Sequence, residues 1–276
     1  ATTEIYTLSL TTLFRSGNQY ELRLALYRDC SGVNAPNTVT VNYRSASCNI
    51  NLNAVLNRIP NTGIDVSPLC PSATSVCRGG NLPGVEEYIY TAIVTLLPCN
   101  DWVMSYSLCC RNNAITTLNT SGAMYIESQL DNLNYPCNNS PTFTNKPVPF
   151  ICVGQQYCFN NGANDIDGDS LSYQMVIPAT SATNNVVYTP PYSATQPLAS
   201  NPAVTLNPLT GFFFIPPPQF LFPFFSFFLT FFFLFLPIFQ FFFSLFFTPF
   251  SFLSRFPSSS SSPTPPSLPP SPPPPL

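Results

Sequence analysis

Alternation of apolar and polar residues is the clearest pattern in the first half of the chain. It is most regular over residues 102–108, where every second position is large and apolar: Trp102, Met104, Tyr106 and Leu108. A period of two residues is typical of a strand with one face buried. Similar runs, separated by Gly, Pro, Asn and Ser, occur at 5–10, 19–27, 38–43, 87–97 and 123–130. Short strands at this spacing predict an all-β sandwich.

The pattern predicts two domains and a tail. The first domain covers residues 1–133, and a Pro/Asn-rich stretch at 134–140 predicts the linker. A second β-domain then extends to residue 216, with two short strands within 148–159 and further strands at 171–177, 185–188 and 203–206 and from residue 212. From residue 217 to 276 the chain is a low-complexity tail for which no fold is predicted.

The tail consists almost entirely of Phe, Ser, Leu and Pro. Its apolar part, 220–252, is long enough to span a membrane, but Pro223, Pro237 and Pro249 interrupt it and no Lys/Arg cluster flanks it. A natural low-complexity stalk would explain the Ser/Pro end but not the phenylalanines. Translation of a pyrimidine-rich stretch, or a reading-frame slip, would explain the whole composition, and we favour that interpretation over a membrane anchor.

Charge and composition exclude several classes of function. The chain has 9 Lys+Arg against 12 Asp+Glu, for a net charge of −3, and no histidine. It therefore offers no basic field for nucleic acid, and it lacks the commonest general base and zinc ligand. We expect no nucleic-acid partner and no enzymatic activity, and a membrane only if 220–252 is a genuine anchor.

Cysteine content indicates an oxidising compartment. All ten cysteines lie between residues 30 and 158, namely Cys30, Cys48, Cys70, Cys77, Cys99, Cys109, Cys110, Cys137, Cys152 and Cys158. Reduced buried thiols and a zinc site are the alternatives, but the zinc-type C-x₂-C spacing is absent. We therefore expect up to five disulfides and an extracellular or cell-surface protein. No secretory signal precedes Ala1, so we expect a mature chain or an internal fragment.

Local spacing suggests three of the pairings. We expect bridges between Cys30 and Cys48, between Cys70 and Cys77, and between Cys152 and Cys158, because each pair borders neighbouring strands or one loop. The other four cysteines are left without assigned partners. The vicinal Cys109 and Cys110 point to opposite faces of a strand, so one can bond inward and the other outward.

An acidic loop, NDIDGDS at 164–170, is the candidate metal site. Asp165, Asp167 and Asp169 place hard oxygen ligands at alternate positions of one turn, and Gly168 allows that turn. Ca²⁺ suits such ligands, although the spacing is not that of an EF-hand. The alternative is a solvated turn that precedes a strand. Calcium is the only cofactor we expect.

Two alternative functions depend on other residues. In a carbohydrate-active enzyme or peptidase, Glu86, Glu87 or Asp101 would be the acid and base. In a carbohydrate-binding module, sugars would stack on exposed aromatic side chains from the set Tyr88, Tyr90, Trp102 and Tyr106. For Trp102 we favour core packing against a disulfide over either role.

Several strings resemble a known family. These include LALYRDCSG at 24–32, VTVNYRSASC at 39–48, PCNDWVMSYSLCCRNNAI at 98–115 and the long string from PCNNSPTF at 136–143 to GDSLSY at 168–173. They resemble the N-terminal region of gliding-motility-associated, adhesin-like surface proteins of Bacteroidetes, which a type IX secretion system exports. The resemblance covers about residues 18–215.

The resemblance implies tandem Ig-like or cadherin-like β-sandwiches in a secreted, non-catalytic structural or adhesin-like module. Its partners would be other surface proteins, neighbouring domains of the same protein, or glycans. The C-terminal sorting domain of the family is missing, which implies a piece of a longer protein. The resemblance also stops near residue 215, which implies an incomplete second domain with an open sheet edge.

Overall fold

The computed structural model describes residues 4–12, 18–109, 111, 115–119, 122–148, 150 and 155–217. These residues belong to one compact unit. They are all-β, as predicted, with one short 3-10 helix, η1 (Val76–Arg78), as the only helical element of the described part. None of these described residues forms a helix long and apolar enough to cross a membrane. Of the tail predicted at 217–276, all residues after 217 lie outside the described residues.

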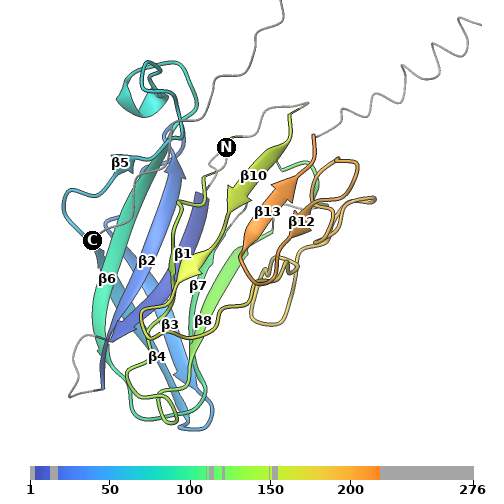
Figure 1. Cartoon of the computed structure of the whole chain (residues 1–276). Helices are drawn as coiled ribbons and strands as arrows, with labels where there is room; N and C mark the ends of the chain where they lie inside the picture. The colour runs from blue at the N-terminus through green and yellow to red at the C-terminus, as the bar shows by residue number, and fades with distance from the viewer. Residues whose placement is uncertain are drawn as a thin grey trace, which may run out of the picture. The chain divides into compact units, whose positions relative to one another are not determined.

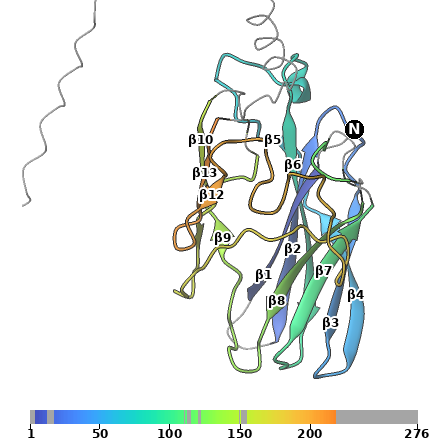
Figure 2. The same cartoon turned by 90° about the vertical axis from the view of Figure 1, so that its right-hand side faces the viewer.

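Eight strands form the main sheet. They are β1 (Glu4–Thr12), β2 (Gln19–Asp29), β3 (Thr38–Ser45), β4 (Ile50–Arg58), β5 (Ile64–Asp65), β6 (Val85–Thr95), β7 (Trp102–Leu108) and β8 (Met124–Leu130). The order is β1-β2-β6-β4-β3-β7-β8, with β5 beside β6, and every pair is antiparallel. The link between β4 and β6 is only two residue pairs long. The sheet therefore folds over at this point into two layers, as in a β-sandwich (Figures 1 and 2).

The main core lies between these two layers. Its fully buried side chains come from both, and the largest are Trp102, Tyr90, Leu22, Leu24, Leu26, Leu56, Leu96 and Met104. Trp102 is 1 % exposed, and its indole N–H donates to the carbonyl of Leu97 at 2.9 Å. The alternation predicted for β7 is confirmed, because Trp102, Met104 and Tyr106 all face this core.

A second, smaller core covers the outer face of β2 and β6. Ala25, Tyr27 and Ile89 are buried there against Val148, and Phe150 packs at the edge. Because the period of a strand is two, these residues necessarily face away from the main core. The segment after the predicted linker thus covers part of the first sheet.

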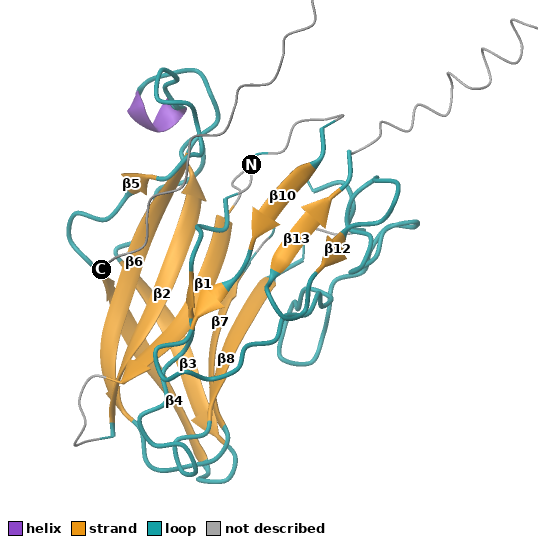
Figure 3. Ribbon diagram, viewed as in Figure 1, coloured by secondary structure: helices purple, strands orange, loops and turns teal. Residues whose placement is uncertain are grey.

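Five short strands make two further sheets, and the strands of the larger one are labelled in Figure 3. The five strands are β9 (Thr142–Phe143), β10 (Tyr157–Asn160), β11 (Ala163–Asn164), β12 (Thr205–Leu206) and β13 (Phe212–Ile215). One sheet has the order β10-β13-β12 and the other pairs β11 with β9. Between β11 and β12 the chain has only isolated bridges.

The predicted strands differ from the structure in several places. Strand β4 was not predicted, although its sequence INLNAVLNR alternates in the required way. The strand predicted at 171–177 is wrong, because these residues form no strand, and 185–188 contributes only isolated bridges. Of the two strands predicted within 148–159, only β10 is present among the described residues, since 149 and 151–154 lie outside them.

The predicted local disulfides are wrong, and the structure pairs distant segments instead. Cys30 bonds to Cys77 and Cys48 bonds to Cys99, whereas Cys70, Cys137 and Cys158 are free and exposed. Cys109 is also disulfide-bonded. The loops of a folded sheet approach each other at its ends, so partners come from strands that are neighbours in space rather than in sequence. Cys110 and Cys152 lie outside the described residues.

Candidate functional site

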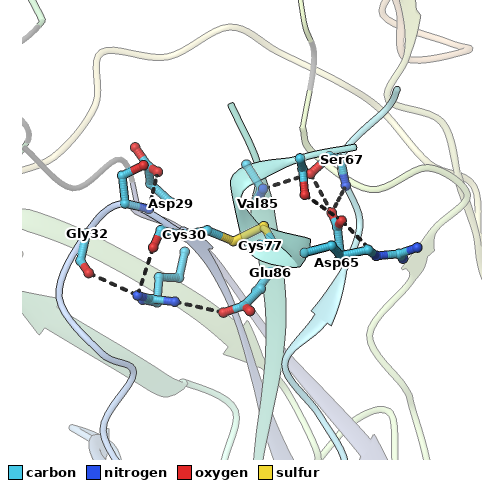
Figure 4. Close-up of a disulfide and its surroundings, with 12 residues drawn as sticks. Asp29, Cys30, Gly32, Asp65, Ser67, Cys77, Val85 and Glu86 are labelled. Atoms are coloured by element: carbon cyan, nitrogen blue, oxygen red, sulfur yellow. Dashed lines mark hydrogen bonds and ion pairs between the residues drawn. A yellow bond between two sulfur atoms is a disulfide. The ribbon is translucent and has the colours of Figure 1, made fainter. Parts of the chain in front are cut away.

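The Cys30–Cys77 disulfide lies between two loops that are held by hydrogen bonds (Figure 4). The buried Arg28 side chain holds the first of these loops. Arg28, near the end of β2, forms an ion pair with Glu86 of β6 at 2.7 Å, and the two side chains are 8 % and 18 % exposed. The same guanidinium donates to the carbonyls of Cys30, Gly32 and Val33. It therefore shapes the turn that carries Cys30 toward Cys77.

On the other side of this disulfide, Asp65 holds the 66–84 loop (Figure 4). Its carboxylate accepts hydrogen bonds from the Ser67 amide and hydroxyl and from the Ser75 hydroxyl, and it pairs with Arg78 at 3.1 Å. Burial alone would raise the pKa of Asp65, but these hydrogen bonds and the Arg78 charge outweigh it and lower the pKa. The Asp65 carboxylate therefore holds the 66–84 loop in place by accepting these hydrogen bonds.

Glu86 and Glu87, the predicted acid and base, are both engaged in structural contacts. Glu86 accepts from Arg28 and from the Tyr88 hydroxyl. Glu87 accepts from the Tyr27 hydroxyl at 2.7 Å and pairs with Lys146, whose Nζ lies 2.5 Å from Oε1. Burial, followed by the hydrogen bond to Glu87 and its charge, raises the pKa of Tyr27.

Asp101 connects the β3–β4 turn to the start of β7. Its carboxylate accepts the Ser45 hydroxyl at 2.5 Å, the Ser47 hydroxyl at 2.6 Å and the Ser47 amide at 2.8 Å. The hydrogen bonds from Ser45 and Ser47 lower the pKa of Asp101 to about 2. The Cys48–Cys99 disulfide joins the same two segments. With its pKa lowered, the Asp101 carboxyl is ionised at neutral pH and accepts the hydrogen bonds that join the two segments.

Most of the aromatic residues predicted for sugar stacking are buried. Tyr90, Trp102 and Tyr106 are 0 %, 1 % and 7 % exposed and belong to the main core, which also contains Cys99. Tyr88 is half-buried and its ring lies under Arg58, with the guanidinium carbon 5.6 Å from the ring centroid. The prediction that Trp102 packs in the core with a disulfide is therefore confirmed, and these side chains form no exposed stacking platform.

In the acidic loop, two carboxylates bond to protein donors. Asp165 Oδ1 accepts the amides of Asp167 and Asp169 at 2.8 and 3.3 Å. Asp167 accepts the backbone and side-chain N–H groups of Asn139. Gly168 has the left-handed φ of 83° that this turn requires. Calcium binding here stays a prediction.

Among the described residues, only Cys30, Cys77 and Glu86 bring three potential ligand atoms within 4.8 Å of one another. Both sulfurs are bonded to each other in a disulfide, so they are not free thiolates. Glu86 is in addition paired with Arg28. This group is a structural cluster and lacks the ligands for a metal.

Two rows of mostly polar residues cross the outer face of β4, β3, β7 and β8, although Ser105 in the first row is only 6 % exposed. The register places one row across these strands as Asn53, Asn42, Ser105 and Glu127. The adjacent row holds Asn51, Arg44, Val103 and Gln129. We call these eight residues the polar face. Asn51, Asn53, Glu127 and Gln129 are exposed, so its amides and its carboxylate are open to a partner.

Hydrogen bonds along the polar face hold its side chains in place. The Asn42 amide donates to the side-chain oxygens of Asn51 at 2.7 Å and Asn53 at 3.0 Å, and the Gln129 amide donates to Glu127 at 3.0 Å. A shallow pocket of about 330 Å³ lies where this face meets the β3–β4 turn, lined by Arg44, Asn49, Asn51, Asp101 and Val103 among others. The Asn alternation in β4 was the sequence signal for this surface, and it was overlooked with the strand.

Comparison with known proteins identifies no relative. No family model, no curated protein and no solved structure matches the chain. Function must therefore be inferred from the residues themselves and from their contacts.

Proposed function

We propose that the chain is a non-catalytic, adhesin-like module of an extracellular or cell-surface protein, and that the polar face is its binding surface. The observation that carries this proposal is the set of hydrogen-bonded amide and carboxylate groups, most of them exposed, on the outer face of β3, β4 and β8. Polar side chains on strands of a packed sheet are held more precisely than side chains on loops, which favours a binding role.

The scaffold supports such a role. One disulfide joins η1 to the residue that follows β2, and the other joins the segment between β6 and β7 to the β3–β4 turn. Disulfides persist in oxidising compartments, so they favour an exported protein. The gliding-motility-associated, type IX-secreted family that the sequence resembles fits the same picture. Its partners would be other surface proteins, neighbouring domains of the same protein, or glycans.

We also propose two tandem domains, Ig-like or cadherin-like, divided near residues 133 and 134. Support comes from the sheet composition, since the eight-stranded sheet uses only residues up to 130 and the small sheets only residues from 142. Separate expression of 1–133, which keeps β1, would test the division. A cooperative unfolding transition in that fragment supports it, and an unfolded fragment argues against it.

Absence of catalysis is part of the proposal. Its support is that the three predicted acid/base residues are engaged, Glu86 with Arg28, Glu87 with Tyr27 and Lys146, and Asp101 with two serines. A carbohydrate-active enzyme is the alternative. Hydrolysis of any member of a glycan panel that disappears in Glu86→Gln or Glu87→Gln would favour that alternative.

The binding surface is tested by adhesion of beads that carry the protein. Asn53→Lys places a charge at the β4 end of the first polar row, and we expect it to reduce adhesion to cell surfaces and immobilised glycans. Asn57→Lys is the matched control, because it lies on the same strand and face, is exposed, and is outside the two polar rows. Equal adhesion of both variants and the parent would refute the role of this face.

Calcium is a separate proposal at Asp165, Asp167 and Asp169. A bound ion stabilises the state that binds it, so millimolar Ca²⁺ should raise the Tm relative to chelator. The triple alanine variant should lose that shift. An identical Tm in Ca²⁺ and chelator, or a full shift in the triple variant, would exclude the site.

A further inference from the structure

The chain between β11 and β12 forms a pocket outside the polar face. Its volume is about 600 Å³, in the range of roughly 300–1,000 Å³ typical of ligand pockets. Most of the lining side chains carry hydroxyl or amide groups, namely Tyr192, Ser193, Thr195, Gln196, Ser200 and Asn201. No charged residue lines it. Such a lining suits a ligand that is rich in hydroxyl groups and carries no charge.

Hydrogen bonds within the loop hold the pocket in shape. The Gln196 amide N–H donates to the Ser193 hydroxyl at 3.1 Å, and its side-chain amide donates to the Ser200 carbonyl at 2.8 Å. The Ser200 N–H donates to the Leu198 carbonyl at 2.9 Å. A ligand would therefore meet a loop that is already ordered, which reduces the entropy lost on binding.

Ser200 is the unusual member of this lining. It is 6 % exposed, and its hydroxyl oxygen has no hydrogen-bond partner. A buried hydroxyl without a partner destabilises a protein unless something else satisfies it. Because Ser200 lines the pocket, a ligand hydroxyl bound there would supply the missing partner.

We propose that this pocket binds a neutral sugar, with Ser200 as a hydrogen-bonding residue and the half-buried Tyr192 ring as a contact for the sugar's C–H face. The site rests on the proposed binding function and names a ligand class for it. It differs from the aromatic residues first considered for sugar binding, most of which are buried in the main core. The absence of lining charges disfavours uronic and sialic acids.

The test is saturation-transfer NMR on the full chain with glucose, galactose, mannose, N-acetylglucosamine and, as the charged comparison, glucuronic acid. We expect transfer to at least one neutral sugar and none to glucuronic acid. Ser200→Ala should weaken binding about tenfold, the effect of one lost hydrogen bond, and Tyr192→Ala should also weaken it. Ser31→Ala and Tyr135→Ala, at exposed positions outside the pocket, are the matched controls.

Thermal unfolding separates a ligand-binding hydroxyl from a structural one. If Ser200 serves the ligand, Ser200→Ala leaves the Tm unchanged or raises it, because the variant removes an unpaired buried polar group. A clear fall in Tm would overturn the assignment, as would sugar binding that Ser200→Ala and Tyr192→Ala leave intact. If no sugar binds but Asn53→Lys still reduces adhesion, the pocket proposal fails and the proposed function stands. If the parent neither binds sugar nor adheres, both fail.

Discussion

Removal of the buried Arg28 side chain should destabilise the protein strongly. Arg28→Ala leaves Glu86 in a largely buried position without its cation, since the two side chains are 8 % and 18 % exposed. Breaking a buried pair in this way costs about 3–5 kcal/mol. The carbonyls of Cys30 and Gly32 also lose a donor. We expect the free energy of unfolding to fall by an amount in the upper part of that range. The total free energy of unfolding of a protein domain is about 5–15 kcal/mol.

Urea unfolding under non-reducing conditions measures this loss. The chain has a single tryptophan, Trp102, and it is buried, so its fluorescence reports on the main core. Arg23→Ala is the control, because Arg23 is on the same strand and exposed, and it should change the stability by less than about 0.5 kcal/mol. Arg28→Lys keeps the charge but not the planar fork, so we expect an intermediate loss.

If the free energy of unfolding of Arg28→Ala lies within about 1 kcal/mol of that of the parent, the reasoning is refuted, because exposed ion pairs contribute no more than this to stability. A double-mutant cycle with Glu86→Ala isolates the pair from the carbonyl contacts. We expect a favourable coupling energy between the two positions. No coupling would mean that the carbonyls, and not Glu86, account for the effect.

Three further predictions concern the other contacts. Replacing Cys48 and Cys99 with alanine should cost about 4 kcal/mol on the chain-entropy estimate, given their separation of 51 residues, and an unchanged urea midpoint would contradict this. Asp101→Asn should flatten the fall in stability below pH 4. A carboxyl group whose pKa is lowered to about 2 in the folded state contributes stability that is lost only as the pH falls below the pKa of the unfolded state. Parallel pH profiles for variant and parent would argue against this prediction. Lys146→Met should cost less than about 1 kcal/mol in urea unfolding, because the lysine is 53 % exposed where it meets Glu87, and a larger loss would show a stronger contact than the structure implies.

Local pattern predicted most strands of the first sheet. For β2, β3, β6, β7 and β8 the alternation of apolar and polar residues located each strand to within two or three residues of its ends. Alternation reports directly on burial of one face, so it is readable without a partner strand. Between β11 and β12, isolated bridges replace regular strands, and the strand predicted at 171–177 is wrong.

The candidate binding surfaces were much less predictable. The polar face depends on the register of β3 with both β4 and β7, which brings Asn53, Asn42 and Ser105 into one row from positions far apart in sequence. The pocket at 191–201 depends on a loop conformation held by Gln196, and nothing in its local composition indicates a cavity. Both surfaces arise from contacts that no single run of residues specifies.

The amino-acid sequence by itself determined the all-β class, the inward face of β7 and the burial of Trp102, because these follow from alternation and side-chain size. Only the tertiary structure decided the disulfide partners and the roles of the carboxylates. Cys30 meets Cys77, and Asp101 meets Ser45 and Ser47, because the folded sheet brings its loops together at its ends. Contacts between residues about fifty positions apart depend on strand order and register, which periodicity does not encode.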